Sequence, residues 1–296
     1  MTTFTPRSPL IPSITAEQRS LRFKRVRDNS QVMTGGIILL VLIVVALLGP
    51  LLSPVGPYAT DTANRLLPPS AAHWFGTDNF GRDLFARVVS GSQVSLVVGF
   101  SVAVITSVLG LAIGLIAAYS RAADRILMRI LDGFMAFPAI LLAIAIMAAL
   151  GVRTENVIIA LSIVFTPYVA RVVRSSALVV KEQTYIESLR AQGASALRIL
   201  WINMTPNVLS PLLIQATFIF ADSIITEAAL SFLGAGVPPP DPSWGNILFD
   251  GKTLIFSAWW MTVFPGVTIM LAVLAINFLG DGLRDLLDPR HRGTRK

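Results

Sequence analysis

Few residues of this sequence could perform acid–base, metal or nucleotide chemistry. The histidines His73 and His291 lie too far apart, and in too exposed a setting, for a buried triad or a two-histidine metal motif. Gly251-Lys252-Thr253 with Gly245 suggests a phosphate-binding loop, but five residues separate the two glycines where that loop has four. Cysteine is absent, which excludes thiolate metal sites. We therefore expect no catalytic residue, no bound cofactor and no metal, and we do not expect the chain to be an enzyme on its own.

A second kind of chemistry, docking onto another protein, is suggested by the stretch 171–207. Residues 185–192 are good helix formers, Gly193 permits a backbone conformation that a side chain would disfavour, and Ala194-Ser195 can begin another short helix. Two short helices around a glycine make a compact knob with Glu187 and Arg190 at its rim. Such a knob suits a cleft on a soluble partner, although an ordinary amphipathic connection explains the pattern equally well.

The composition places these residues in a membrane protein. Apolar residues make up 54% of the 296 residues and charged residues 14%, against roughly 25% charge in soluble domains. The mean hydropathy is +0.69. Too little charge is available to cover a water-soluble surface, so the net charge of +7 is not interpreted as a nucleic-acid-binding face. The expected environment is a lipid bilayer.

Apolar runs long enough to cross a bilayer predict an all-α protein of six transmembrane helices. The first run could instead be the core of a secretory signal, but its basic tail is long and Gly49-Pro50-Leu51-Leu52 is a poor cleavage site. We expect a tail over 1–33, a membrane domain over 34–289 with a loop at about 181–207, and a tail over 290–296. The predicted spans cover about 35–52, 94–119, 133–151, 157–173, 208–233 and 259–279.

The placement of the basic residues predicts the orientation. With six spans, 19 of the 24 lysines and arginines fall in the two tails and in the loops after spans two and four. Positive charge accumulates on the cytoplasmic side of membranes. We therefore expect both termini, and the stretch 171–207, to be cytoplasmic.

Several segments resemble a known family. Glu187, Gly193 and Pro206 have the spacing of the EAA loop of ABC importer permeases, although Ser188 and Leu189 replace the usual alanines. Other stretches resemble dipeptide/oligopeptide-type permeases, with Ala86 in place of the usual serine; they are FGTDNFGRDLFAR (75–87), EAALSFLG (227–234), PSWG (242–245) and NFLGDGLRDLLDP (277–289). The chain thus resembles the second (C-type) permease subunit of such an importer over about residues 35–289.

The resemblance implies a type I importer fold in the bacterial inner membrane, with the loop acting as a coupling helix. It implies a second homologous permease subunit, two ATPase subunits that use ATP, and an extracytoplasmic substrate-binding protein. Peptides are the expected cargo, with nickel complexes, glutathione, opines or oligosaccharides as alternatives. A stand-alone channel or secondary transporter would need ion-coupling acids, broken helix pairs or an inverted repeat. The implied ATPase-docking residues are Glu187, Arg190, Gly193, Ala194 and Ser195.

The resemblance also implies that a binding protein docks on the outer face, for which we consider Asp78, Arg82, Asp83 and Trp244. The alternative, which we favour for the first three, is a loop whose charges pair locally. In the predicted second span, 94–119, the pattern Gly110-x-x-x-Gly114 permits close helix approach, either within the chain or to a partner subunit.

Ionisable residues within spans are functional candidates because burying them is costly. Asp222 and Glu227 are separated by about 140° around one helix, so they do not share a face. We interpret them as structural or subunit contacts, with a path-lining role for Asp222 as the alternative. Asp132, one turn after Arg129, is expected to form an ion pair along its own helix.

Overall fold

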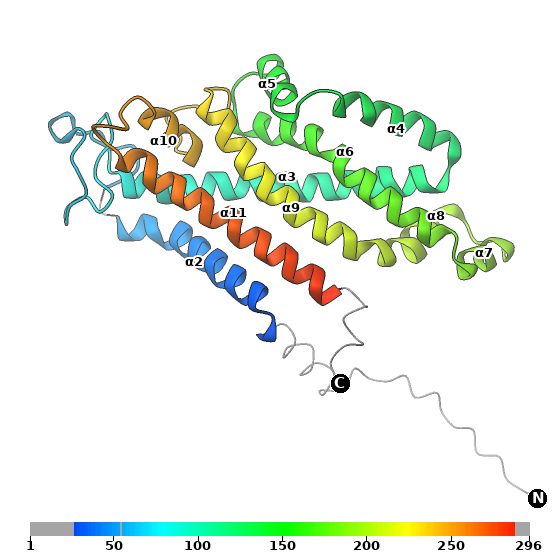
Figure 1. The fold of residues 1–296 in the computed structure, drawn as a ribbon. Helices are drawn as coiled ribbons and strands as arrows, with labels where there is room; N and C mark the ends of the chain where they lie inside the picture. The colour runs from blue at the N-terminus through cyan, green and yellow to red at the C-terminus, as the bar shows by residue number, and fades with distance from the viewer. Residues whose placement is uncertain (1–26, 54, 288–296) are drawn as a thin grey trace, which may run out of the picture.

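The structure, a computed structural model, describes residues 27–53 and 55–287. Long helices lie side by side along one direction (Figure 1). Five are long and apolar enough to cross a membrane. No strand occurs in either of these two ranges. The predicted tail 290–296, and most of the tail 1–33, fall outside the described residues. The five helices are α2 (Ser30–Leu52), α3 (Leu84–Tyr119), α6 (Thr154–Lys181), α9 (Thr205–Phe232) and α11 (Trp260–Leu287).

The predicted third span, 133–151, is not one continuous helix. It divides between the end of α4 (Arg121–Met135) and α5 (Ala139–Leu150), which meet at a bend of 93°. Pro138 lies at the break, where it has no N–H to donate to a helix and disfavours helical geometry before it. The 12 residues of α5 span about 18 Å, less than a bilayer core. The count reaches six only if the bent pair forms one span.

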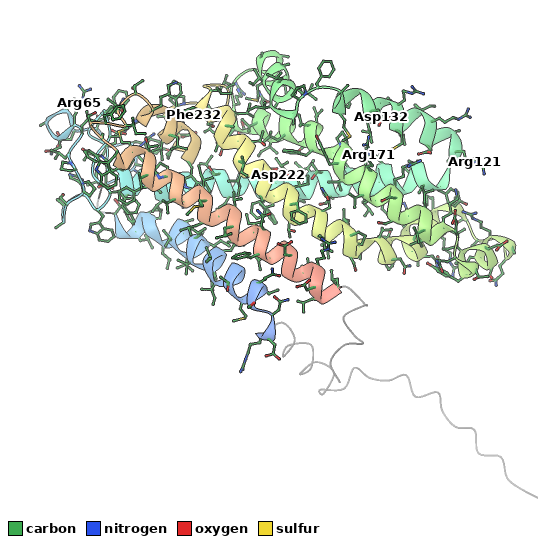
Figure 2. The ribbon with its side chains drawn as sticks, viewed as in Figure 1. Arg65, Arg121, Asp132, Arg171, Asp222 and Phe232 are labelled. Carbon is green, nitrogen blue, oxygen red and sulfur yellow. The ribbon has the colours of Figure 1, made fainter. Side chains whose placement is uncertain are left out.

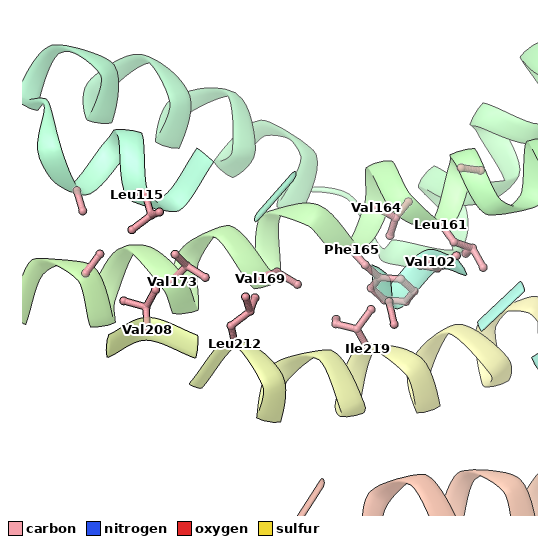
Figure 3. Packing of buried hydrophobic residues seen from close by; sticks show 14 of the residues in the cluster. Val102, Leu115, Leu161, Val164, Phe165, Val169, Val173, Val208, Leu212 and Ile219 are labelled. Carbon is pink, nitrogen blue, oxygen red and sulfur yellow. The ribbon is translucent and has the colours of Figure 1, made fainter. Parts of the chain in front are cut away.

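The principal core lies between α3, α6 and α9, where buried aliphatic side chains interlock along the helices (Figure 3). Two glycines of α3 allow α6 to approach closely. A Cβ atom on Gly110 would lie 2.6 Å from Val169 Cγ1, and one on Gly114 would lie 2.7 Å from the carbonyl oxygen of Ala170. The G-x-x-x-G pattern therefore serves packing within the chain.

The helices α2 and α11 pack beside this core. A Cβ atom on Gly35 of α2 would lie 2.5 Å from the carbonyl oxygen of Ala275, so these two backbones are in close contact. The other face of α2 exposes a run of large apolar side chains, among them Leu40, Leu47 and Leu51. Exposed apolar surface of this extent is expected where lipid covers the helix.

Shorter elements close the two ends of the bundle. At one end, the segment 55–83 with the 3₁₀-helix η1 (Thr62–Asn64) and the helix α10 (Trp244–Gly251) surround the start of α3. At the other end lie α7 (Thr184–Ala191) and α8 (Ala196–Arg198), followed by the π-helix η2 (Ile199–Met204) that leads into α9.

Candidate functional site

The helices α7 and α8 with their connection, residues 184–198, form a knob at one end of the bundle (Figure 1). Gly193 has a φ of +79°, a conformation that favours glycine, and it reverses the chain after α7. The N–H of Ala194 donates to the carbonyl of Leu189 at 3.0 Å, and the side chain of Ser195 accepts from the N–H of Arg198 at 3.4 Å. The predicted order of helix, glycine and capped second helix is present.

One apolar side chain anchors the knob to the bundle. Ile186 is fully buried and belongs to the same core cluster as Ile199 and Met204 of η2. Leu189 and Ala194, which flank the turn, pack partly buried against that cluster. Because α7 has only eight residues and would be marginal alone, these contacts decide whether it keeps its position.

Polar contacts join the knob and the end of α6 to neighbouring helices. The Lys181 Nζ donates to the terminal carbonyls of α3, at 2.7 Å to Ala118 and 3.1 Å to Tyr119. The Arg190 guanidinium lies 5.1 Å from the centre of the Tyr119 ring, within the range of a cation–π contact. The Nδ2 of Asn207, at the start of α9, donates to Tyr185 Oη at 3.0 Å. A displacement of the knob would therefore reach α3, α6 and α9 together.

The predicted docking residues lie on this knob. The side chains of Glu187, Arg190 and Ser195 are exposed, Gly193 is exposed, and Ala194 is partly buried. Beside them lie exposed apolar side chains that sequence reasoning missed: Leu197 (69% exposed), Trp201 (45%) and Ile202 (65%). Their apolar character was visible in the sequence, but whether Trp201 and Ile202 face the core depends on the π-helical turn that contains them. Exposed large apolar side chains close in sequence to exposed charged residues are compatible with a protein contact surface.

Two ion pairs join α4 to α6, and Figure 2 labels Asp132 and Arg171, which form the first of them. Asp132 Oδ1 accepts from Arg171 Nη2 at 2.7 Å, and both side chains are more than half exposed. The expected pairing of Asp132 with Arg129 is therefore wrong, because α4 lies beside α6 and offers a nearer cation. Asp124 accepts two hydrogen bonds from Arg174 in the second pair.

Glu227 is fully buried and links three elements near the other end. Its Oε2 accepts from Ser95 Oγ of α3 at 2.8 Å, and its Oε1 accepts from Ser231 Oγ at 2.7 Å. The Ser95 hydroxyl in turn accepts from the N–H of Trp244 at 3.4 Å, and the Ser231 hydroxyl from that of Val237 at 3.0 Å. These contacts agree with the structural interpretation of Glu227. Asp222, by contrast, is exposed.

The residues considered for a binding-protein contact point inward instead. Asp78 is buried with its Oδ2 2.6 Å from Arg82 Nε and 3.5 Å from Arg87 Nε. Asp83, also buried, caps α3 by accepting from the N–H of Ala86 at 2.8 Å, and it lies 2.9 Å from His73 Nδ1. The contacts match the alternative of a locally paired loop, because buried charges need partners.

Trp244, at the start of α10, also points into the protein. Trp244 is fully buried, and its indole N–H donates to Ser92 Oγ at 3.1 Å, so its side chain cannot present itself to a binding protein here. Asp250 of α10 lies 3.3 Å from Arg82. Burial raises the pKa of Asp250, and the Arg87 and Arg82 guanidiniums oppose that rise.

The Gly251-Lys252-Thr253 segment forms no phosphate cradle. Lys252 Nζ lies 3.7 Å from the centre of the Phe249 ring and 5.7 Å from that of Phe232. Within residues 27–53 and 55–287, no three His, Cys, Asp or Glu side chains are grouped to hold a metal ion.

Comparison with known families gives two matches. Residues 110–293 match the family described as "Binding-protein-dependent transport system inner membrane component". Residues 18–69 match the "N-terminal TM domain of oligopeptide transport permease C". Together they cover most of the sequence.

Curated relatives are similar over nearly their whole length. A putative peptide transport system permease protein of Brucella abortus is 48% identical over 96% of both chains. The dipeptide transport system permease protein of Alkalihalophilus pseudofirmus is 45% identical, over 90% of this chain and 88% of its own. A glutathione transport system permease protein of Escherichia coli is 43% identical, over 92% and 90%.

A solved structure has a related fold. A chain of the MetNI methionine ABC transporter, in an inward-facing conformation, superimposes with a TM-score of 0.58 at 22% identity. The match covers 68% of this chain and 97% of that one. At this identity the likeness concerns the fold alone.

Proposed function

The chain belongs to the binding-protein-dependent transport system inner membrane components, and we propose that it is one of two homologous permease subunits of an ATP-driven peptide importer. In this proposal it has no catalytic, metal or cofactor site of its own. Two ATPase subunits hydrolyse ATP, and an extracytoplasmic binding protein delivers the cargo. The observation that carries the proposal is the α7–α8 knob, which is exposed at its tip and fixed at its base.

The knob can transmit motion because its two sides differ. Its outer side presents Glu187, Ser195 and Leu197 to a partner, while Ile186 and Lys181 connect its base to the core and to the end of α3. Closure of two ATPase subunits can move the crossing helices only through a rigid contact. A flexible connecting loop would lack the buried anchor.

The helix directions support a cytoplasmic position for the knob. The end of α2 meets the start of α3, since a Cβ atom on Gly49 would lie 2.4 Å from Val89 Cγ1. Arg190 of the knob contacts Tyr119 at the opposite end of α3, so the knob shares the side of the membrane on which α2 begins. The basic N-terminal tail precedes α2, and positive charge favours the cytoplasmic side. We place the protein in a bacterial inner membrane with both tails inside.

Peptides are the proposed cargo because the names of the Brucella and Alkalihalophilus relatives refer to peptide and dipeptide transport. Glutathione is the second candidate, supported by the 43% identical Escherichia coli relative.

The experiment that tests the proposal adds one charged side chain to the knob. Gly193→Asp should abolish ATP-dependent uptake of labelled dipeptide, and cargo-stimulated ATPase activity, in proteoliposomes that contain the full transporter and its binding protein. Gly151→Asp is the matched control. Both glycines have positive φ (+79° and +87°), and no atom lies within 4 Å of a Cβ added at either. Gly151 combines its φ with a ψ of 159°, a conformation that disfavours side chains more strongly, so its variant carries at least as much backbone strain. Gly151 lies between α5 and α6, away from the knob.

The outcomes separate coupling from folding. We expect Gly193→Asp to assemble in normal yield and lose uptake, whereas Gly151→Asp keeps both. Equal uptake by the two variants would refute the role of the knob. Uptake of glutathione but of no other peptide would favour the second candidate cargo.

A further inference from the structure

Asp222 is a carboxylate exposed in the middle of an apolar helix (Figure 2). It lies ten residues before Phe232, the end of α9, which places it about 15 Å inside that end. One turn further on, Ile225 is 47% exposed. The acid therefore lies at bilayer depth, on a surface that this chain leaves open.

Asp222 differs from Glu227, the other acid of α9, because its carboxylate has no partner in the described part of the chain. Across 27–53 and 55–287, no side chain or N–H contacts the Asp222 carboxylate within hydrogen-bond or ion-pair distance; Thr226 Oγ1 donates only to its backbone carbonyl, at 2.7 Å. Glu227, by comparison, accepts two hydrogen bonds. A lone carboxylate facing lipid is costly, so the open surface around Asp222 must face water or another polar group in the assembled protein.

In the described ranges 27–53 and 55–287, no basic residue of a crossing helix lies at that depth. The basic residues of its crossing helices lie near helix ends: Arg87 opens α3, Arg171, Arg174 and Lys181 lie in the last three turns of α6, and Arg284 lies in the last turn of α11. The Asp222 carboxylate is therefore available to a positively charged group from outside the described chain, such as one carried by the cargo.

We propose that Asp222 lines the cargo path and binds the positively charged ammonium group of a peptide as it crosses. The inference rests on the proposed function, because it needs a cargo that carries an amine. One acid beside exposed apolar side chains such as Ile225 is a typical ligand surface, in which the polar group fixes orientation and the apolar groups add contact area. Asp222 would then form a weak, transient binding site for the amine on the cargo path.

The test is a charge series at this position in the complete transporter, with alanyl-alanine as the probe. Each complex is supplied with saturating binding protein loaded with labelled peptide, and the initial rate of ATP-dependent uptake is measured. We expect Asp222→Glu to stay within about threefold of the unmodified complex. Asp222→Asn should fall about tenfold, the effect of one charge-assisted hydrogen bond, and Asp222→Lys should fall further. Asp285→Asn, the same change at an exposed carboxylate in the last turn of α11, should keep its rate.

A second arm identifies the group that is recognised. Uptake of N-acetyl-alanyl-alanine, which lacks the ammonium, is compared at equal occupancy of the binding protein. Its rate should be the same in the unmodified and Asp222→Asn complexes, because the carboxylate then has no cation to bind. The double comparison removes any preference of the binding protein, which is common to both complexes.

Three results would overturn the inference alone. Unchanged uptake by Asp222→Asn would mean that the acid does not face the path. An equal loss for both peptides would mean that it does not recognise the amine. Loss of the second permease subunit from the purified Asp222→Asn complex would mean that it pairs with that subunit. Absence of peptide uptake by the unmodified complex would instead overturn the proposed function, and the inference with it.

Discussion

Removing the anchor of the α7–α8 knob should release α7 without unfolding the protein. Ile186 is fully buried, and Ile186→Ala deletes three carbon atoms from the core cluster that also contains Ile199 and Met204. At about 0.8 kcal/mol for each buried carbon, the loss is about 2.4 kcal/mol before any cavity term. Since 1.36 kcal/mol is tenfold, the open state of α7 should become about 50-fold more populated.

Amide hydrogen exchange of the purified complex measures this population directly. Exchange of the α7 amides in Ile186→Ala should accelerate about 50-fold, while amides in the middle of α3 stay protected. Ser188→Ala is the control, because Ser188 is exposed on the same helix and donates only to the carbonyl of Thr184. If α7 exchanged at the same rate in Ile186→Ala as in the unmodified protein, Ile186 would not be the anchor.

Three further predictions concern stability, measured as the free energy of unfolding or the melting temperature in detergent. Glu227→Ala should cost about 2–4 kcal/mol, through two lost hydrogen bonds and a cavity, and Glu227→Gln should cost less; equal melting of all three proteins would refute the buried linkage. Gly114→Ala should cost about 1–3 kcal/mol because the new methyl group meets Ala170, whereas Gly266→Ala, with open space around its Cβ position, should not destabilise; the reverse order would contradict the packing of α3 on α6. Arg171→Ala should cost less than about 1 kcal/mol, because its ion pair with Asp132 is exposed, and a larger loss would show that α4 depends on it.

The length of the uncharged runs in the sequence predicted most of the helices, but it could not locate the break between α4 and α5. The run 133–151 carries no charge, and the sequence therefore predicted one span. Pro138 was the available signal, yet prolines 167, 211 and 265 lie inside continuous helices. Whether a proline bends or breaks a helix depends on the neighbours that can satisfy the freed backbone groups, and those neighbours are tertiary.

In the candidate sites too, features set by neighbours in sequence were predictable, and features set by the packing of helices were not. The knob was predictable because Gly193 and Ser195 act on their own neighbours in sequence. The partners of Asp132 and Glu227 were not, because Arg171 and Ser95 are distant in sequence and become adjacent only when the helices pack. For the same reason, sequence spacing separated Asp222 from Glu227 around the helix but could not say which of the two is buried.

The central claim, that the knob docks on an ATPase subunit, can be tested by cross-linking, because the chain has no cysteine of its own. A Ser195→Cys variant that still supports uptake is treated with a short bifunctional reagent that joins a thiol to nearby amines. Ser257→Cys, exposed in the segment between α10 and α11, is the control. The account predicts that position 195 cross-links to an ATPase subunit and position 257 does not. A transport-active complex in which position 195 never reaches that subunit would contradict it.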